Sequence, residues 1–130
     1  MNRIDLDKWL KFIERIQNGY NPVSYHNKTH AADVAQTLYY FLVGGEWMKK
    51  GEMDNLDLFS MILASAIHDY EHPGYNNMFL INSSHPLAIR YNDVSVLEMH
   101  HVAASSKLMK DKSLNFMSTL DKEVQKDLRK

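Results

Sequence analysis

The sequence predicts an all-α fold, a compact domain built from several packed helices. Apolar residues recur at three- and four-residue spacing in several segments, which is the period of an amphipathic helix. Nowhere do β-branched residues alternate with polar ones over the length of a strand. The 130 residues, 45% of them hydrophobic, suffice for one domain or a piece of one.

The first two helices are expected to end at glycines. An amphipathic helix is expected over residues 6–16, with its stop near Gly19. A second helix is expected over residues 28–43, with its stop at Gly44. The inward-facing residues of this second helix are expected to be Val34, Leu38, Phe41 and Leu42.

The third expected helix, over residues 55–69, is apolar nearly all round, which is typical of a central, buried helix. A short helix is expected over residues 77–81. The next, over residues 95–109, begins with Ser95 and Glu98 in the spacing of a capping box. The last is expected to begin near residue 118 and run to the end of the chain, with Leu120, Val124 and Leu128 on one face.

Composition excludes several classes of protein. The chain has no cysteine, so disulfides are excluded and any metal must be held by nitrogen and oxygen ligands. It has no signal-peptide pattern and no apolar stretch long enough to span a membrane, which predicts an intracellular, cytoplasmic location. The net charge of −1 argues against nucleic acid as a partner. Two basic clusters are interpreted as solvated helix faces: Lys107, Lys110 and Lys112, then Lys122, Lys126, Arg129 and Lys130.

Two pairs of histidines have the spacing of one helical turn. His26 and His30 are four residues apart, and so are His68 and His72. Asp69 follows His68 directly, at the end of the apolar third helix. A helix C-terminus favours a cation, and a buried carboxylate there needs a partner. Nitrogen and carboxylate ligands suit zinc as well as harder divalent cations.

Each of these residues also has an ordinary structural explanation. A histidine such as His26 or His30 can be a surface or capping residue, and Asp69 can cap its helix or form a salt bridge. Spacing alone therefore leaves a metal site and these structural roles equally open. The remaining polar and aromatic candidates have similar alternatives: a capping role for Glu98, a packed aromatic for Tyr25, a turn or cap for Asn77, a loop position for His85 and a hydrogen-bonded core histidine for His101.

Three segments of the sequence have residue patterns that are specific enough to compare with a known family. Residues 25–34 read YHNKTHAADV, residues 68–77 read HDYEHPGYNN and residues 91–101 read YNDVSVLEMHH. In order and spacing they resemble the Y-H-N-x-x-H-A-x-D-V, H-D-x-x-H-x-G-x-x-N and Y-N-D-x-S-V-L-E-x-H-H segments of mammalian-type (class I) 3′,5′-cyclic nucleotide phosphodiesterases. The resemblance implies the multi-helix HD-type fold of that family's catalytic domain.

The resemblance also implies roles for named residues. It implies two divalent metal ions, zinc together with magnesium or manganese, and a small-molecule cyclic nucleotide, cAMP or cGMP, as the partner. Hydrolysis to the 5′-monophosphate would proceed by attack of a hydroxide that bridges the metals, with His26 as the general acid. The metal ligands would be His30, His68 and Asp69. Groups supporting the site would be His72, Glu98 and Asn77, and Tyr25 would line the nucleotide pocket.

The resemblance further implies a longer catalytic domain than these residues. In the family, another metal-binding aspartate and a purine-binding glutamine lie further downstream, so residues 1–130 are expected to be the N-terminal and central part of such a domain, here truncated. Regulatory domains or partners would lie outside this chain. Two alternatives stay open: a truncated, catalytically impaired homologue that acts as a binding module, and another HD-type phosphohydrolase sharing the His68–Asp69 pair.

Overall fold

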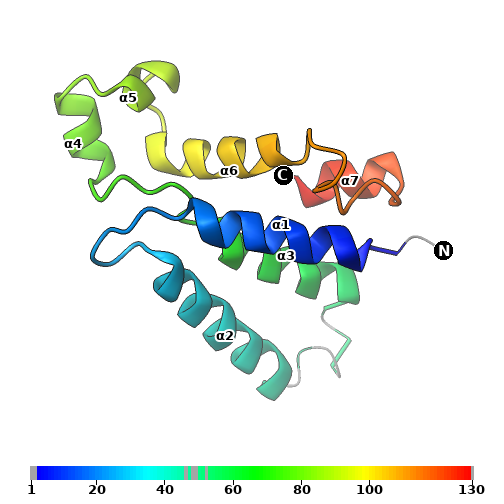
Figure 1. Ribbon diagram of the computed structural model, residues 1–130. Helices are drawn as coiled ribbons and strands as arrows, with labels where there is room; N and C mark the ends of the chain where they lie inside the picture. The colour runs from blue at the N-terminus through cyan, green and yellow to red at the C-terminus, as the bar shows by residue number, and fades with distance from the viewer. Residues whose placement is uncertain (1–2, 46, 48–49, 52, 130) are drawn as a thin grey trace.

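The computed structural model describes residues 3–45, 47, 50–51 and 53–129. Within that part of the chain every regular element is a helix, which confirms the all-α prediction (Figure 1). The helices are α1 (Leu6–Gly19), α2 (Lys28–Gly44), α3 (Asn55–Ile67), α4 (Asn77–Asn82), α5 (Pro86–Arg90), α6 (Val96–Leu108) and α7 (Lys122–Leu128). None of them is long and apolar enough to cross a membrane.

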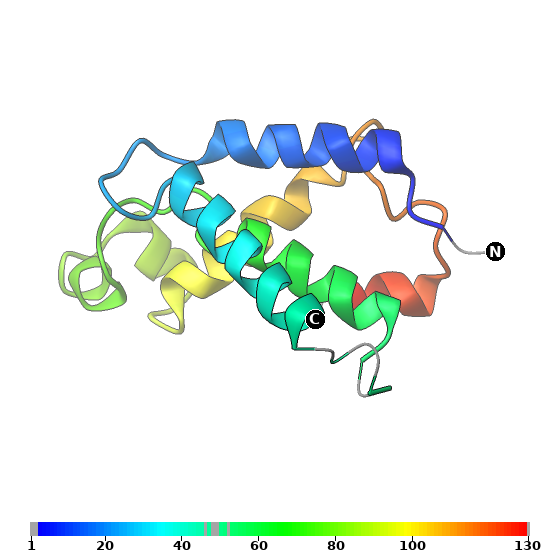
Figure 2. The same ribbon diagram turned by 90° about the horizontal axis from the view of Figure 1, so that it is seen from below.

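Helix α3 is the central element, since it contacts α1, α2 and α6. The chain runs out along α2 and returns along α3, so the start of α2 lies beside the end of α3 (Figures 1 and 2). The main core fills the space between α1, α3 and the segment before α7, and it consists of Phe12, Ile16, Leu63, Tyr70, Phe116, Met117 and Leu120. A smaller core joins α4, α5 and α6 through Leu80, Ala88, Val96 and Leu97.

The burial predicted for α2 and α3 was wrong in part. Leu42 of α2 is buried, whereas Phe41 is 63% exposed. Successive helical residues point about 100° apart, so only one of the two can face α3. Helix α3 is central as predicted, but it is only partly buried: Leu63 is buried, whereas Met61 is 39% exposed, because neighbouring helices cover only part of its circumference.

The predicted capping box at the start of α6 is also wrong. Ser95 has a left-handed backbone conformation (φ 41°) and its side chain makes no capping hydrogen bond. The side chain of Asn77 instead accepts the Leu97 N–H at 2.9 Å. Helix α6 is therefore capped from α4, by a residue nearly twenty positions earlier, which no local pattern could indicate.

Helix α5 was not expected, and helix α7 is shorter than expected. Helix α5 was not predicted, because a proline after turn-forming residues usually indicates a break. Proline is also favoured in the first turn of a helix, and His85 caps that turn by accepting the Leu87 N–H. Helix α7 begins at Lys122 rather than near residue 118, because residues 111–121 form turns that bury Phe116 and Met117. The predicted apolar face of this last segment is confirmed in its contacts with the main core.

Candidate metal centre

Helices α2 and α3 bring three candidate ligands to one place. Asn27 caps α2 by accepting the N–H groups of Thr29 and His30, which fixes His30 in the first turn. His68 is the C-cap of α3, and Asp69 follows it. Because α2 and α3 are antiparallel, residues far apart in sequence meet at this end of the helix pair.

The three side chains present their ligand atoms to a common point. His68 Nε2 lies 3.0 Å from Asp69 Oδ2 and 3.3 Å from His30 Nε2, and His30 Nε2 lies 3.4 Å from the same carboxylate oxygen. Metal–ligand bonds of about 2.1 Å at octahedral to tetrahedral angles place ligand atoms about 3.0 to 3.4 Å apart. The Asp69 side chain is only 13% exposed. The donor types and their separations therefore fit a divalent metal ion.

His68 is held in the tautomer that a ligand needs. Its Nδ1 lies 2.8 Å from the Ser65 carbonyl oxygen, so Nδ1 carries the hydrogen and donates it. The lone pair of Nε2 then faces His30 and Asp69. Hydrogen bonding of the second ring nitrogen to a backbone carbonyl is the usual way in which a ligating histidine is oriented.

His26 and His72 form a second group with Asp69. The His26 ring stacks on the His72 ring, with centroids 4.0 Å apart and planes 13° apart. Ligand atoms of His26, Asp69 and His72 also lie close enough together to hold an ion. Asp69 is common to both groups, which is the arrangement that a bridging carboxylate requires.

The hydrogen bonds of His72 suit a supporting group better than a ligand. Its Nδ1 accepts the Gly74 N–H at 3.0 Å, so in the neutral ring Nε2 carries the hydrogen. Burial, reinforced by the nearby His26, lowers the pKa of His72 to about 4. Asn21 further fixes this residue by donating to the His72 carbonyl at 3.0 Å. Nothing in the loop composition around Asn21 would have indicated that role.

His101 is the hydrogen-bonded core histidine that the sequence predicts. It is 3% exposed, and its Nδ1 donates to the Tyr70 carbonyl at 2.6 Å. Burial lowers its pKa, so the ring is neutral near pH 7. Its Nε2 lies 3.9 Å from Asp69 Oδ1, whereas His30 and His68 lie close to Oδ2.

Asn77 and Glu98 form a hydrogen-bonded pair near this region, and Tyr25 lies beside His30. Asn77 donates to both carboxylate oxygens of Glu98, at 3.3 and 3.0 Å, and this hydrogen bonding lowers the pKa of Glu98. Tyr25 is 63% exposed, with its ring centroid 4.6 Å from that of His30. An exposed aromatic ring beside the ligand cluster is accessible to a bound molecule.

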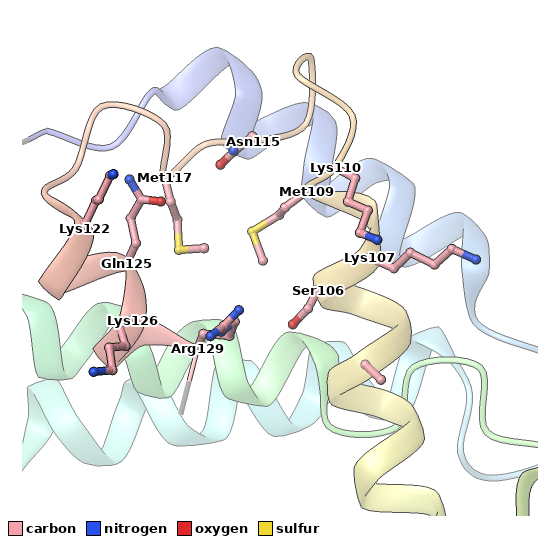
Figure 3. Close-up of a pocket in the computed structure, with 11 residues that line it drawn as sticks. Ser106, Lys107, Met109, Lys110, Asn115, Met117, Lys122, Gln125, Lys126 and Arg129 are labelled. Atoms are coloured by element: carbon pink, nitrogen blue, oxygen red, sulfur yellow. The ribbon is translucent and has the colours of Figure 1, made fainter. Parts of the chain in front are cut away.

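A separate cavity of about 710 Å³ lies between α6 and α7 and contains none of these residues. Figure 3 shows the side chains of Met109 and Met117 pointing into it, while those of Lys107 and Lys126 extend away. The lysines and the arginine of the two basic clusters are exposed, as predicted, and Lys130 lies outside the described residues.

Comparison with known proteins decides the family. A profile described as 3′5′-cyclic nucleotide phosphodiesterase matches residues 25–130. The chain belongs to this phosphodiesterase family. It is 39% identical over 119 residues to a probable 3′,5′-cyclic-AMP phosphodiesterase of Caenorhabditis elegans, which covers 92% of the chain. A 3′,5′-cyclic-AMP phosphodiesterase of Dictyostelium discoideum is also 39% identical and covers 98% of the chain.

A solved structure supports the same assignment. The phosphodiesterase domain of the RhoPDE fusion protein from the choanoflagellate Salpingoeca rosetta superposes with a TM-score of 0.85 at 35% identity, over 97% of the chain and 39% of that domain's chain. The phosphodiesterase chain described here spans 17% and 12% of the two curated relatives named above. The resemblance and the fold predicted from the three sequence blocks are therefore confirmed.

Proposed function

We propose that residues 1–130 form the metal-binding part of a phosphodiesterase catalytic domain, which hydrolyses a 3′,5′-cyclic nucleotide to the 5′-monophosphate. The observation that carries the proposal is the convergence of His30, His68 and Asp69, with ligand atoms 3.0 to 3.4 Å apart. The family assignment favours this reaction over that of another HD-type phosphohydrolase. The names of two relatives make cAMP the first substrate to assay.

In this proposal two divalent cations, zinc with magnesium or manganese, would supply charge neutralisation at the phosphate and activation of a water molecule. His30 and His68 would hold the first ion through Nε2, and Asp69 would contribute to both. The Ser65 carbonyl keeps His68 in the required tautomer before any ion arrives. The pre-formed cluster lowers the cost of organising the site.

His26 is proposed to protonate the leaving ribose oxygen. It is half-buried at the edge of the cluster and stacks on His72, which limits rotation of its ring. An imidazole suits this task because its ordinary pKa lies near neutral pH. Since burial keeps His72 neutral, the stacked pair carries at most one positive charge at pH 7. Tyr25 would contact the nucleotide beside His26.

Glu98 and Asn77 are proposed to support the site rather than to bind metal directly. The two hydrogen bonds from Asn77 keep the Glu98 carboxylate ionised and fixed in orientation. An ionised, oriented carboxylate can order water molecules around a nearby cation. His72, with its Nε2–H directed away from Gly74, can donate a hydrogen bond in the same region.

The test is hydrolysis of cAMP and of cGMP by the purified full-length protein, which includes the downstream part of the catalytic domain, with added Zn²⁺ and Mg²⁺. Asp69→Ala should abolish turnover, and His26→Gln should lower kcat by about 10² to 10⁴-fold, the usual contribution of a general acid. Asp7→Ala is the matched control, because Asp7 is an exposed aspartate in the first turn of α1, away from the cluster. Activity that survives Asp69→Ala would remove the metal mechanism, whereas metal binding without turnover in the unmodified protein would favour a binding module.

A further inference from the structure

Glu71 lies between two members of the candidate site and has an unusual backbone. It separates Asp69 and Tyr70 from His72 in sequence, and its φ is 60°. This left-handed region is disfavoured for residues with a side chain and is normally occupied by glycine. A glutamate that stays in this conformation must be held there by its contacts.

The contact that holds Glu71 is a buried histidine on α6. His100 is 8% exposed, and its Nε2 donates to Glu71 Oε2 at 2.9 Å. The Nδ1 atom of His100 lies 3.5 Å from the Tyr91 hydroxyl, which can donate to it. These two partners assign the hydrogen of the His100 ring to Nε2 and fix the ring in one orientation.

Two adjacent residues of α6 bind two adjacent residues of the loop between α3 and α4. His101 donates to the carbonyl of Tyr70, while His100 donates to the side chain of Glu71. The Tyr70 side chain, 3% exposed, is packed into the main core. The backbone just before Glu71 and the Glu71 side chain are therefore both fastened to α6, and the turn at Glu71 sets the direction in which His72 leaves the loop.

We propose that Glu71 and His100 are positioning residues that set the place of His72 relative to Asp69, and that metal affinity depends on their hydrogen bond. This inference rests on the metal site of the proposed function. Neither residue is assigned as a ligand. The pair borders a cavity of about 480 Å³, so a smaller side chain at either position would enlarge an existing cavity and would not open a new one in the core.

Replacing Glu71 by glycine separates two effects: the strain of its backbone conformation, which affects stability, and the hydrogen bond of its side chain, which is proposed to affect metal affinity. Glu71→Gly removes the hydrogen bond but relieves the unfavourable φ. We expect an unchanged or higher Tm by circular dichroism, together with about tenfold weaker Co²⁺ binding, followed by the visible absorption of the ion in the intact chain. A merely structural residue would change stability and affinity in the same direction.

Asp93→Gly is the matched control, because Asp93 is an exposed acidic residue with φ 61° outside the site. It relieves an equally unfavourable φ, so it should not lower Tm, and it should leave Co²⁺ affinity unchanged. Glu71→Gln keeps an oxygen that can accept from His100, so it should bind Co²⁺ within about threefold of the unmodified chain. Equal losses in the Gln and Gly variants would assign the effect to charge and overturn the positioning role.

Asp69→Asn distinguishes failure of this inference from failure of the site itself. If the Co²⁺ spectrum of the unmodified chain does not depend on Asp69, the proposed metal site is wrong. If the spectrum depends on Asp69 but the affinity of Glu71→Gly equals that of the unmodified chain, only the positioning inference is overturned.

Discussion

Asn77 and Glu98 form the connection between α4 and α6: one amide nitrogen donates to both carboxylate oxygens, at 3.3 and 3.0 Å. The amide oxygen of Asn77 meanwhile accepts the Leu97 N–H at 2.9 Å. A single side chain thus caps α6 and orients the acid in its first turn. Because Asn77 performs the capping, the Glu98 carboxylate is available to the site.

Asn77→Ala should therefore destabilise the protein by about 1 kcal/mol, the usual cost of losing a helix cap. It should also raise the pKa of Glu98 toward its ordinary value, because the hydrogen bonds from Asn77 are the largest cause of its lowering. Urea unfolding and carboxyl NMR titration measure the two effects. Ser95→Ala discriminates between caps: a loss of stability as large as that of Asn77→Ala would restore the capping-box interpretation.

Gly19 lies against the ring of Tyr70, which leaves no space for a side chain at this position. A methyl group at Gly19 would overlap the Tyr70 ring, which is buried in the main core and cannot move aside freely. Gly19→Ala should cost about 1–3 kcal/mol of unfolding free energy, as overpacking usually does. Gly44→Ala is the control, because Gly44 also ends a helix and an added methyl there meets nothing. Equal stabilities of the two variants would contradict the packing described here.

Ionisation of the Tyr20 hydroxyl is expected to make the free energy of unfolding depend on pH in the alkaline range. Its hydroxyl donates to the Ala66 carbonyl at 2.9 Å, in the last turn before His68, and burial raises its pKa to about 12. The unfolded chain loses this proton near pH 10, so the contribution of Tyr20 is complete below that pH and is lost as pH rises towards 12. Urea unfolding of the unmodified chain and of Tyr20→Phe should show a difference that shrinks above about pH 10. A difference that is constant from about pH 8 to about pH 11 would contradict a raised pKa.

The fold and most of the cluster could be predicted because their signals are local. Helical periodicity places α1, α2 and α3, and the His68–Asp69 pair follows from its position at the end of an apolar helix. The meeting of His30 with His68 is not local: it depends on the antiparallel pairing of α2 and α3, which the sequence gives only through resemblance to a family.

Other features depend on contacts between distant residues and could not be predicted. Asn77 caps a helix that begins nearly twenty residues later, and Glu71 adopts a glycine-like conformation because His100 holds its side chain. Phe41 and Leu42 are both apolar, and only the packing direction of α2 decides which of them is buried. Three-dimensional neighbours outweigh local preference at each of these positions.

Zn²⁺ binding by the metal-free chain, measured by isothermal titration calorimetry, tests the central claim most directly. The unmodified chain should bind Zn²⁺ at the cluster, and Asp69→Asn combined with His68→Asn should remove that binding. His85→Asn, a histidine outside the cluster that caps α5, should leave it unchanged. Equal Zn²⁺ affinity in the unmodified chain and the double variant would contradict a metal site at His30, His68 and Asp69.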